Sequence, residues 1–325
     1  MMIRRWNAVL LLFAAPLAAQ GNPECAGVGG GQLPPIAQRE QNVCNAAIDG
    51  AHLFTPVAGI LLSGGNPFLG SAGGLGGFPH TGLTVRANVT KLVIPDLDYS
   101  GDGTTVGARR SVPAPAPLIE AALGVFGGLA NGSLAVDALG SAQLIPTSLI
   151  SDVHVNVNAR RIGSVAVGLG VGARVTLIDE STYLPAVAVS IMHRSIPTIG
   201  VGSVAEGDEF AFESNMSATN YRVTIGKRIG FLALGAGAGW DKYSGDAAVD
   251  YRDPVTLDEQ EPIPVTLADS RALGFVDAGF AVGQFYLIGE AGMQAGKDLH
   301  LGTTFTGNNP NSNRLFGSLG LRLGL

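Results

Sequence analysis

The sequence has 325 residues, a formal net charge of −6 and 14% charged residues, whereas an average globular chain has about 25%. Without a basic stripe interleaved with aromatic residues, it gives no ground for nucleic acid as a partner. A water-soluble domain of this size would be short of polar surface, and no apolar run of about 18 residues follows the N-terminal region to form a membrane helix. Such a composition is typical of a membrane β-barrel.

The N-terminus reads as a secretory signal peptide. Arg4 and Arg5 precede a short apolar run, and small residues follow at Ala18 and Ala19. The run is too short for a membrane-spanning helix, which needs roughly 20 residues, so an uncleaved anchor is the weaker alternative. Cleavage after Ala19 leaves 325 − 19 = 306 residues and a net charge of −6 − 2 = −8. The expected division of the chain is a signal peptide (1–19), an N-terminal plug or periplasmic segment (20–79) and a barrel (80–325).

Residues 20–79 are rich in glycine and proline, and their one helical pattern is a short amphipathic piece, Gln38 to Leu53. Cys25 and Cys44 are the two cysteines of the chain. In an oxidising periplasm we expect them to form a disulfide, closing a loop of about 20 residues and contributing about 3 kcal/mol. Free thiols or a metal site are the alternatives.

Strand-like alternation begins at Leu83 and runs to Ile94. The stretch from Asp96 to Asp102 then places oxygen ligands at alternate positions before a glycine, like the start of a calcium loop. Gly107 stands where such a loop has its bidentate glutamate. We therefore favour a polar turn over a calcium site, and we read the proline-rich residues up to Pro117 as irregular.

The rest of the chain alternates in a series of strands. An Asn131-Gly132 turn joins two apolar stretches, Leu118–Leu129 and Ser133–Gln143. Two acidic stretches, 195–215 and 241–269, read as long loops, whereas the turns at Lys227 and Gln284 are short. Further strands are expected at 153–160, 165–177, 187–194, 219–225, 232–240, 272–282, 285–305 and 313–325.

The closing stretch, Asn313–Leu325, sorts its side chains by parity: leucines form one row, and Arg314 and Arg322 belong to the other. It resembles the final strand of a bacterial outer-membrane barrel, although many of those end in an aromatic residue and this one ends in Leu325. If this strand ends in the periplasm, the short turns are periplasmic and the acidic stretches lie outside the cell, the asymmetry expected of such barrels.

The predicted fold is therefore all-β: an antiparallel transmembrane β-barrel of about 12 strands, within a range of 10–14, in the outer membrane of a Gram-negative-type bacterium. The partners expected are outer-membrane lipid and the barrel-assembly machinery, the latter through Asn313–Leu325. A secreted, water-soluble β-sandwich, which would share the alternation, is the alternative.

The polar rows of the strands supply the candidate site. Charges inside a barrel must be hydrated or paired, because an isolated buried charge costs several kcal/mol. We favour internal salt bridges that hold the barrel in shape over a basic lining that selects anionic or amphipathic solutes. The candidate lumen-lining residues are Asp152, His154, Arg160, Arg174, Arg194, Arg222, Arg271, Asp277, Glu290 and Arg322.

Catalytic and metal-binding motifs are missing. The five histidines show no metal-ligand spacing, and no G-x-S-x-G elbow is present. Asp152 and His154 share a strand face, like an acid and a base, but any polar lumen produces such a pair by chance. We therefore expect no enzyme activity, no cofactor and no metal.

Several short motifs resemble a family of bacterial outer-membrane β-barrels of unknown function, and the resemblance runs from about residue 50 to the C-terminus. These motifs are Phe78-Pro79-His80-Thr81-Gly82, Val85, Asn88-Val89, Ile94-Pro95-Asp96, Asn215-Met216-Ser217-Ala218-Thr219-Asn220 and Gly226-Lys227-Arg228. More distantly, the glycine-rich segment before a barrel resembles the fatty-acid transporter class of outer-membrane proteins. That class implies uptake of a hydrophobic solute, but none of its ligand motifs is found here.

These observations lead to two functional hypotheses. The first is a passive channel or transporter for a small solute, hydrophobic by the resemblance, with residues 20–79 as plug or gate. The second is a structural or adhesive surface barrel that transports nothing and meets an external partner through its acidic stretches.

Overall fold

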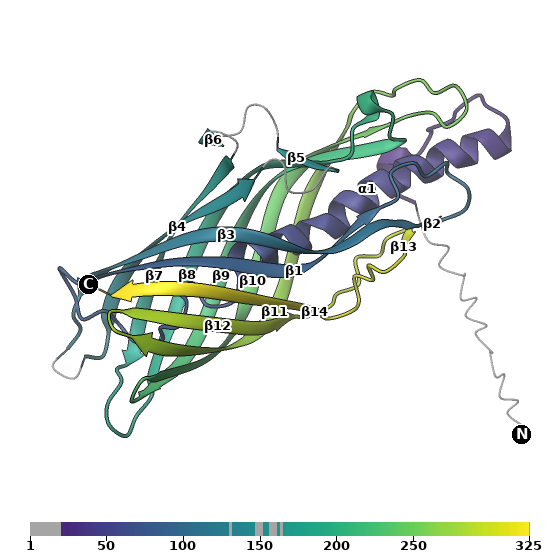
Figure 1. Ribbon diagram of the computed structural model, residues 1–325. Coiled ribbons are helices and arrows are strands. Elements are labelled where there is room, and N and C mark those ends of the chain that lie inside the picture. The colour runs from purple at the N-terminus through teal and green to yellow at the C-terminus, as the bar shows by residue number, and fades with distance from the viewer. Residues whose placement is uncertain (1–20, 130–131, 147–151, 156–160, 163–164, 325) are drawn as a thin grey trace, which may run out of the picture.

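The chain forms a closed antiparallel β-barrel with a helix inside it (Figure 1). The structure, a computed structural model, describes residues 21–129, 132–146, 152–155, 161–162 and 165–324. The wall strands are β1 (Thr81–Pro95), β3 (Ala108–Phe126), β4 (Ala135–Pro146), β7 (Val165–Ile178), β8 (Ala186–Val201), β9 (Phe210–Ile229), β10 (Leu232–Tyr251), β11 (Ile263–Val282), β12 (Phe285–Gln294) and β14 (Arg314–Gly324).

These ten strands pair in the order β8-β9-β10-β11-β12-β14-β1-β3-β4-β7, and pairing of β7 with β8 closes the barrel. Short β5 (Val153–Val155) and β6 (Arg161–Ile162) add to β8 and β7, and β2 (Thr105–Val106) pairs with β13 (Thr304–Phe305) in a separate parallel sheet. The all-β closed barrel is confirmed, but about 12 wall strands were expected and ten are found. The stretch read as a strand at 153–160 contributes only β5 among its described residues.

The wall sorts its side chains between lipid and lumen. On β14, Leu315, Leu319 and Leu321 are exposed on the outer face, whereas Phe316 and Arg322 are buried inside. On β1 the outward row stays apolar from Leu83 to Val89 and changes at Lys91. This outer apolar surface fits the lipid-facing band of a membrane barrel, because hydrocarbon offers polar groups no partner.

The two ends of the barrel differ. Gly230–Phe231 and Gly283–Gln284 are tight turns at the end where the C-terminus lies, whereas longer connections such as 96–107, 252–262 and 295–313 lie at the other end. Short turns are periplasmic and long loops extracellular in barrels of this type, so these are called the periplasmic and outer ends. The short turn expected at Gln284 is confirmed at the periplasmic end, whereas the turn expected at Lys227 lies further on, at Gly230–Phe231, because Lys227 still belongs to β9.

The strands are longer than the alternation indicated. β3 begins at Ala108, inside the proline-rich stretch read as irregular, and most of 195–215 and 241–269 belongs to β8, β9, β10 and β11. Twenty tilted residues span roughly 50 Å, well beyond an apolar band of about 25 Å. Strand pairing uses the main chain, so loss of apolar alternation marks where the wall leaves the lipid, not where a strand ends. Conversely, 285–305 is not one strand, because β12 ends at Gln294.

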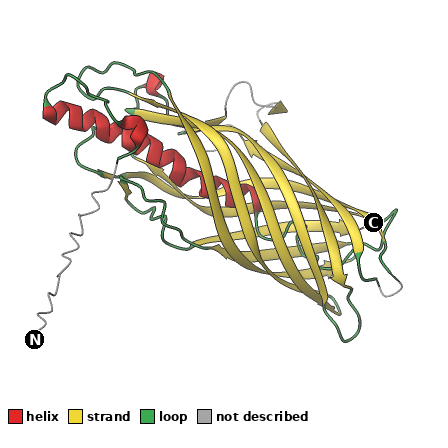
Figure 2. Cartoon of the chain, turned by 180° about the vertical axis from the view of Figure 1, so that it is seen from behind, coloured by secondary structure: helices red, strands yellow, loops and turns green. Residues whose placement is uncertain are grey.

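Helix α1 (Pro34–Ser63) enters the lumen from the outer end (Figure 2). Proline at its first position is compatible with a helix start, and Gly64, with φ of 65°, ends it. We expected only an amphipathic piece at 38–53, but the helix has 30 residues and, from Glu40 onward, is buried or half-buried on every side. Among the described residues it alone is long and apolar enough to cross a membrane, yet 83% of its most apolar window is buried within the protein.

Candidate functional site

The periplasmic half of the lumen is filled by the segment that follows α1, residues 63–75. Eight charged side chains surround this lumen segment, each from a different wall strand. We call them the lumen clamp: Arg86 (β1), Glu120 (β3), Asp137 (β4), Arg174 (β7), Arg222 (β9), Asp277 (β11), Glu290 (β12) and Arg322 (β14). All eight are buried, with no more than 9% of any residue exposed.

The arginines of the clamp donate hydrogen bonds to carbonyl groups of the lumen segment. Arg86 Nη2 donates to the Ser63 carbonyl at 2.9 Å, and Arg222 Nε donates to the Gly65 carbonyl at 2.8 Å. Arg222 also donates to the Gly64 carbonyl at 3.3 Å, and Arg174 to that of Ser71 at 3.1 Å. Arg322 donates to the Leu69 carbonyl at 3.3 Å and to the Gly70 carbonyl.

The carboxylates of the clamp accept from N–H groups of the same segment. Glu290 accepts from the main-chain N–H groups of Gly65, at 3.0 Å, and Asn66, at 2.6 Å. Glu120 accepts from Leu69 at 3.3 Å, and Asp137 from Leu75 at 3.2 Å. Asp277 accepts from the side-chain amide of Asn66 at 3.1 Å.

The charges of the clamp balance, because it contains four arginines and four carboxylates. Arg174 Nη2 lies 2.8 Å from Asp137 Oδ2, and Arg86 Nη2 lies 2.8 Å from Glu120 Oε1. A buried ion pair adds little stability by itself, but removing one partner leaves a buried charge uncompensated at a cost of about 3–5 kcal/mol. The clamp therefore holds the lumen segment only as a complete set.

Further buried polar groups link the clamp to the outer half. Arg222 Nη2 lies 2.7 Å from Asp241 Oδ1, which also accepts from Asn220 Nδ2 at 2.6 Å. Tyr243 donates its hydroxyl to Asp241 Oδ2 at 2.9 Å and accepts from Gln294 at 2.9 Å. Above this level the lumen contains the apolar side chains of α1, so the polar network ends where the helix packing begins.

The helix fits closely against this wall. A Cβ at Gly59 would lie 2.2 Å from Cε1 of Tyr243, so only glycine lets α1 approach the ring. Val43, Ile48, Leu53 and Val57 are buried in one cluster with residues from the outer parts of the wall. The helix therefore fills much of the outer half of the lumen.

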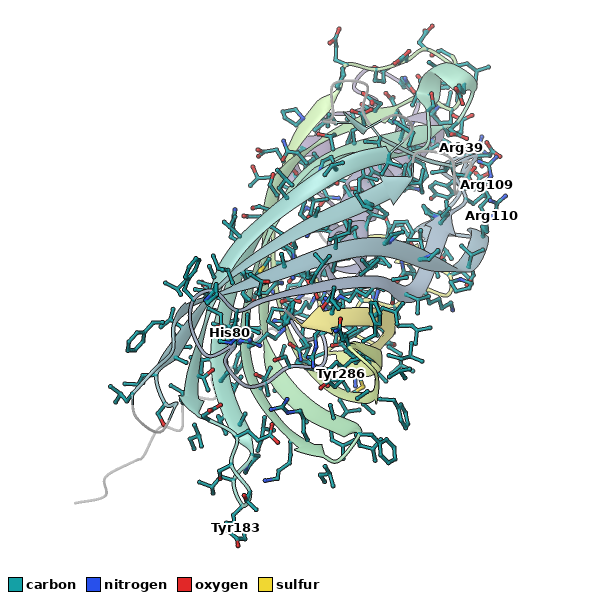
Figure 3. All side chains as sticks on the ribbon, turned by 60° about the vertical axis from the view of Figure 1, so that its left-hand side comes forward. Arg39, His80, Arg109, Arg110, Tyr183 and Tyr286 are labelled. Carbon is teal, nitrogen blue, oxygen red and sulfur yellow. A yellow bond between two sulfur atoms is a disulfide. The ribbon has the colours of Figure 1, made fainter. Side chains whose placement is uncertain are left out.

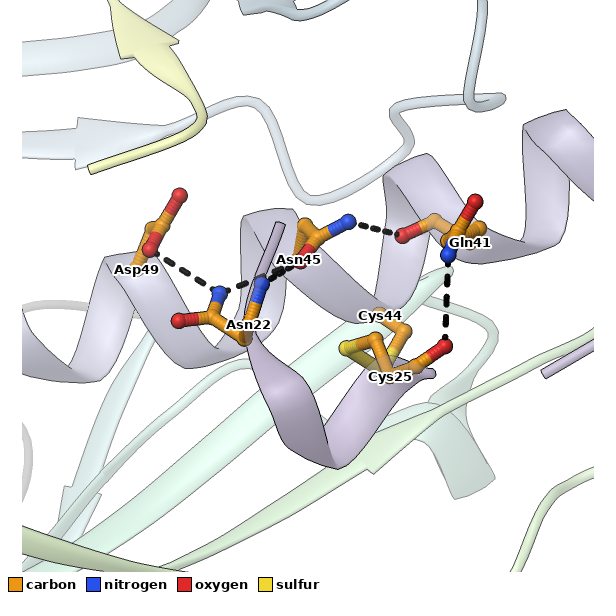
Figure 4. Close-up of a disulfide and its surroundings, with 6 residues drawn as sticks. All are labelled: Asn22, Cys25, Gln41, Cys44, Asn45 and Asp49. Atoms are coloured by element: carbon orange, nitrogen blue, oxygen red, sulfur yellow. Dashed lines mark hydrogen bonds between the residues drawn. A yellow bond between two sulfur atoms is a disulfide. The ribbon is translucent and has the colours of Figure 1, made fainter. Parts of the chain in front are cut away.

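At the outer end the N-terminal turn is fastened to α1 (Figure 4). The expected disulfide between Cys25 and Cys44 is present, with a Cα–Cα distance of 5.9 Å. Gln32 Nε2 donates to Asp253 Oδ2 of the loop between β10 and β11 at 2.9 Å. Arg39 Nη2 lies 2.7 Å from Asp102 Oδ1 of the loop after β1. The N-terminal turn thus lies among the outer loops, opposite the C-terminus.

The structure places the residues that the sequence singled out in three groups. Five of them belong to the clamp: Arg174, Arg222, Asp277, Glu290 and Arg322. Arg194 is buried beside the clamp, with its Nη2 atom 3.8 Å from Oε1 of Glu120. Arg271 is buried higher up, paired with Asp269 at 2.6 Å. Asp152 and His154 lie at the outer rim, where Asp152 faces Arg109 at 3.8 Å and His154 hydrogen-bonds Glu213 at 3.1 Å. Arg160 lies outside the described residues.

The supposed calcium loop is a turn held by its own side chains. Asp98 N donates to Asp96 Oδ1 at 3.3 Å, Ser100 Oγ donates to Asp102 Oδ2 at 3.0 Å, and Asp102 is also paired with Arg39. Within the part of the chain that the structure describes, no group of three or more His, Cys, Asp or Glu side chains is arranged to hold a metal ion.

Sequence reasoning missed three clamp residues: Arg86, Glu120 and Asp137. Glu120 and Asp137 each interrupt an apolar strand at an inward position, and Arg86 belongs to the polar row of β1. A single charge at an inward position of an otherwise apolar strand is the signal that could have identified them, because such a charge must find a partner in the lumen.

A second feature is an apolar cavity of about 80 Å³ between α1 and the wall in the outer half. It extends to the seam between β3 and β4, where pairing stops at Leu118 opposite Gln143. Its lining contains no charged residue: Phe54, Val57, Ala58, Leu61, Leu62, Leu92, Ala114, Pro115, Ala116, Leu144, Ile145, Val153 and Ile199.

Prolines explain why the seam stays unpaired. Pro113, Pro115 and Pro117 lie opposite residues of β1, and proline has no N–H to donate. A residue at a non-hydrogen-bonded position of the β1–β3 ladder directs its main-chain N–H away from β1, toward β4. Prolines fit at such positions without weakening the pairing with β1, and the donors that they lack are then those that β4 would need. Among the described residues, ladder pairing of β3 with β4 begins at Leu118. The outward residues just before it, Pro115 and Pro117, lie opposite Val89 and Ala87 of β1, so this part of the seam lies at the level of the lipid, whereas Pro113 lies opposite Lys91.

The closed barrel, the apolar outer face and the asymmetry of its ends define the class of the protein: an outer-membrane β-barrel. No family model and no curated protein sequence matches the chain. Solved structures with a similar fold include the outer membrane protease OmpT from Escherichia coli, at 10% identity over 76% of this chain and 96% of that chain, with a TM-score of 0.39.

Two further structures with a similar fold belong to other kinds of outer-membrane barrel. The translocator domain of the autotransporter NalP from Neisseria meningitidis is 10% identical over 86% of this chain and 99% of that chain, with a TM-score of 0.41. A FadL homologue from Pseudomonas aeruginosa is 10% identical over 75% of this chain and 89% of that chain, with a TM-score of 0.25. The expected likeness to outer-membrane barrels, FadL-like transporters among them, is confirmed.

One expectation must be corrected. From the lack of catalytic motifs we excluded an enzyme, but one of the barrels that this chain resembles is a protease. The fold therefore gives no support to that exclusion.

Proposed function

We propose that the protein carries a small, uncharged, hydrophobic solute between the outer surface and the lipid of the outer membrane. The observation that supports this is the apolar cavity at the β3–β4 seam. A cavity without charged lining favours hydrocarbon over ionic solutes, because an unpaired buried polar group costs free energy. Its position beside lipid-facing prolines gives the solute an exit that leaves the filled lumen undisturbed.

The helix supports the same proposal. Phe54, Val57 and Leu61 lie on α1 and form the inner wall of the cavity, so the plug contributes to the solute site. A barrel whose lumen is filled passes solutes through its middle only if the plug moves. A sideways route needs only local separation of β3 and β4, because among the described residues their ladder pairing stops at Leu118 and Gln143.

The test measures uptake of a single-ring aromatic hydrocarbon by lipid vesicles that contain the full chain. We expect the protein to accelerate transfer over protein-free vesicles. Ala116→Phe, which fills the cavity from β3, should abolish the acceleration. Ala121→Phe is the matched control, because Ala121 lies on the same strand and faces lipid. Equal loss in both variants, or preferential passage of anions, would contradict the proposal.

A second candidate is a structural or adhesive surface barrel, favoured by the filled lumen. The acidic residues of its outer loops, such as Asp258 and Glu259, would then meet an external partner. Absence of accelerated uptake by a correctly folded wild-type chain would select this candidate.

A further inference from the structure

We infer that the periplasmic half of the lumen is a peptide-binding site that takes the main chain of a bent, glycine-containing peptide. In the resting protein it is occupied by residues 63–75 of the same chain. This inference does not depend on the transport proposal, which concerns the outer half and the β3–β4 seam.

The clamp recognises main chain. Of the twelve hydrogen bonds described between clamp and lumen segment, ten reach main-chain atoms, and two reach the side chains of Asn66 and Ser71. The main chain of a peptide offers an N–H donor and a carbonyl acceptor at each residue. Two arginines follow two carboxylates in turn around the lumen, and this arrangement would pair with the same groups of any peptide that follows the same path.

Glycine is needed at several positions of this path, and Gly65 and Gly70 show why. A Cβ at Gly65 would lie 2.6 Å from Cγ of Phe275 and 2.9 Å from Oε2 of Glu290. At Gly70, with φ of +70°, it would lie 2.5 Å from Cδ1 of Ile288. The site therefore selects for glycine at these positions and for apolar side chains at the buried positions of Phe68 and Leu69, which defines the chemical class of its ligand.

A competing peptide has a way in. A cavity of about 450 Å³ lies beside the lumen segment and includes Arg322 and Asp277 of the clamp in its lining. Its lining also includes Tyr286, near the start of β12. Figure 3 shows Tyr286 well away from the outer loop residues Arg39, Arg109 and Arg110. A peptide can thus reach the clamp from the periplasm without passing α1.

The test uses the full chain with Gly65→Val and Gly70→Val, which displace the chain's own segment from the clamp. A fluorescent synthetic peptide with the sequence of residues 62–76 is titrated in detergent, and its anisotropy is followed. We expect this chain to bind the peptide at least about tenfold more tightly than the wild-type chain, whose site is occupied. A peptide with the same two valines should not bind.

The contribution of the clamp to peptide binding is tested in the chain that carries Gly65→Val and Gly70→Val. Adding Glu290→Gln should weaken peptide binding on the order of 100-fold, because a charge-assisted acceptor of two N–H groups is lost and the clamp is left unbalanced. Glu206→Gln, at an exposed glutamate of the outer end, should change nothing. Equal binding of both peptides, or no binding to a chain that still migrates as a folded barrel on unboiled gels, would overturn the inference.

A second measurement remains if the valine chain does not fold. In the wild-type chain, amide hydrogen exchange at Gly65, Asn66, Leu69 and Leu75 should be slow, because each amide donates to a clamp carboxylate. Glu290→Gln should accelerate exchange at Gly65 and Asn66 more than at Leu75. Exchange at the rate of a free peptide in the wild-type chain would contradict a clamped segment.

Discussion

The two halves of the lumen hold the same N-terminal region by different means. In the outer half, α1 is buried among apolar side chains such as Ile48, Leu53 and Val57. In the periplasmic half, the lumen segment is hydrogen-bonded to eight buried charged side chains, although it also buries Phe68 and Leu69. Apolar contact is non-directional and tolerates a shift of the helix, whereas hydrogen bonds to main-chain atoms fix one register. Burial of apolar side chains thus stabilises the docked helix, and the hydrogen bonds of the clamp fix the position of the lumen segment.

The largest effect should come from breaking the periplasmic half. Arg174→Ala leaves Asp137 buried without its partner and removes the donor to Ser71, so we expect a loss of about 3–5 kcal/mol in unfolding free energy. The measurement is urea unfolding, followed by the mobility difference between boiled and unboiled samples. In the double variant Arg174→Ala/Asp137→Ala most of the loss should be recovered, and a double variant as unstable as the single one would argue against a charge effect.

Loss of the disulfide should affect the outer end alone. Replacing both Cys25 and Cys44 by serine opens a loop of about 20 residues and should cost about 3 kcal/mol in the stability of the docked N-terminal turn. Limited proteolysis of the folded protein should then cleave residues 21–33, while exchange of the clamped amides at Gly65 and Leu75 stays unchanged. Faster exchange at both ends would show that the two halves are not independent.

A smaller change is expected where the halves meet. Tyr243→Phe removes the hydroxyl that bridges Asp241 and Gln294, leaving both with an unfilled hydrogen bond at a cost of about 1–3 kcal/mol. The ring still packs against Gly59, so α1 should stay in place. Urea unfolding gives the magnitude, and Tyr221→Phe, at a lipid-facing aromatic on the adjacent strand, is the matched control.

The smallest expected effect is a pH dependence at the outer end. Burial raises the pKa of Glu40, and the nearby charge of Asp253 raises it further. A raised pKa means that the folded state favours the protonated carboxyl, so docking of the N-terminus of α1 should strengthen as the pH falls through the folded pKa toward the ordinary value of 4.5. The measurement is the pH dependence of amide hydrogen exchange at residues 38–42 in the wild-type chain and in Glu40→Gln. If the variant shows the same pH dependence as the wild-type chain, Glu40 is not the group that titrates.

The barrel itself could be predicted from the sequence. Rows such as Leu315, Leu319 and Leu321 against Phe316 and Arg322 fix which side chains face lipid, because a strand turns alternate residues to opposite faces. The short turns and the disulfide followed from residue types with one dominant use. Strand ends did not follow, since main-chain pairing continues past the lipid where alternation fades, and this is why β10 and β11 were read too short.

Local pattern alone determined the barrel class, the orientation of its ends and the inward position of most charges. Only the tertiary structure decided what those charges do. Glu120 and Asp137 appear in the sequence as isolated interruptions of apolar strands, and their partners Leu69 and Leu75 lie 51 and 62 residues away in the chain. The length of α1 was likewise invisible to periodicity, because a helix buried on all sides has no polar face to repeat every 3.6 residues.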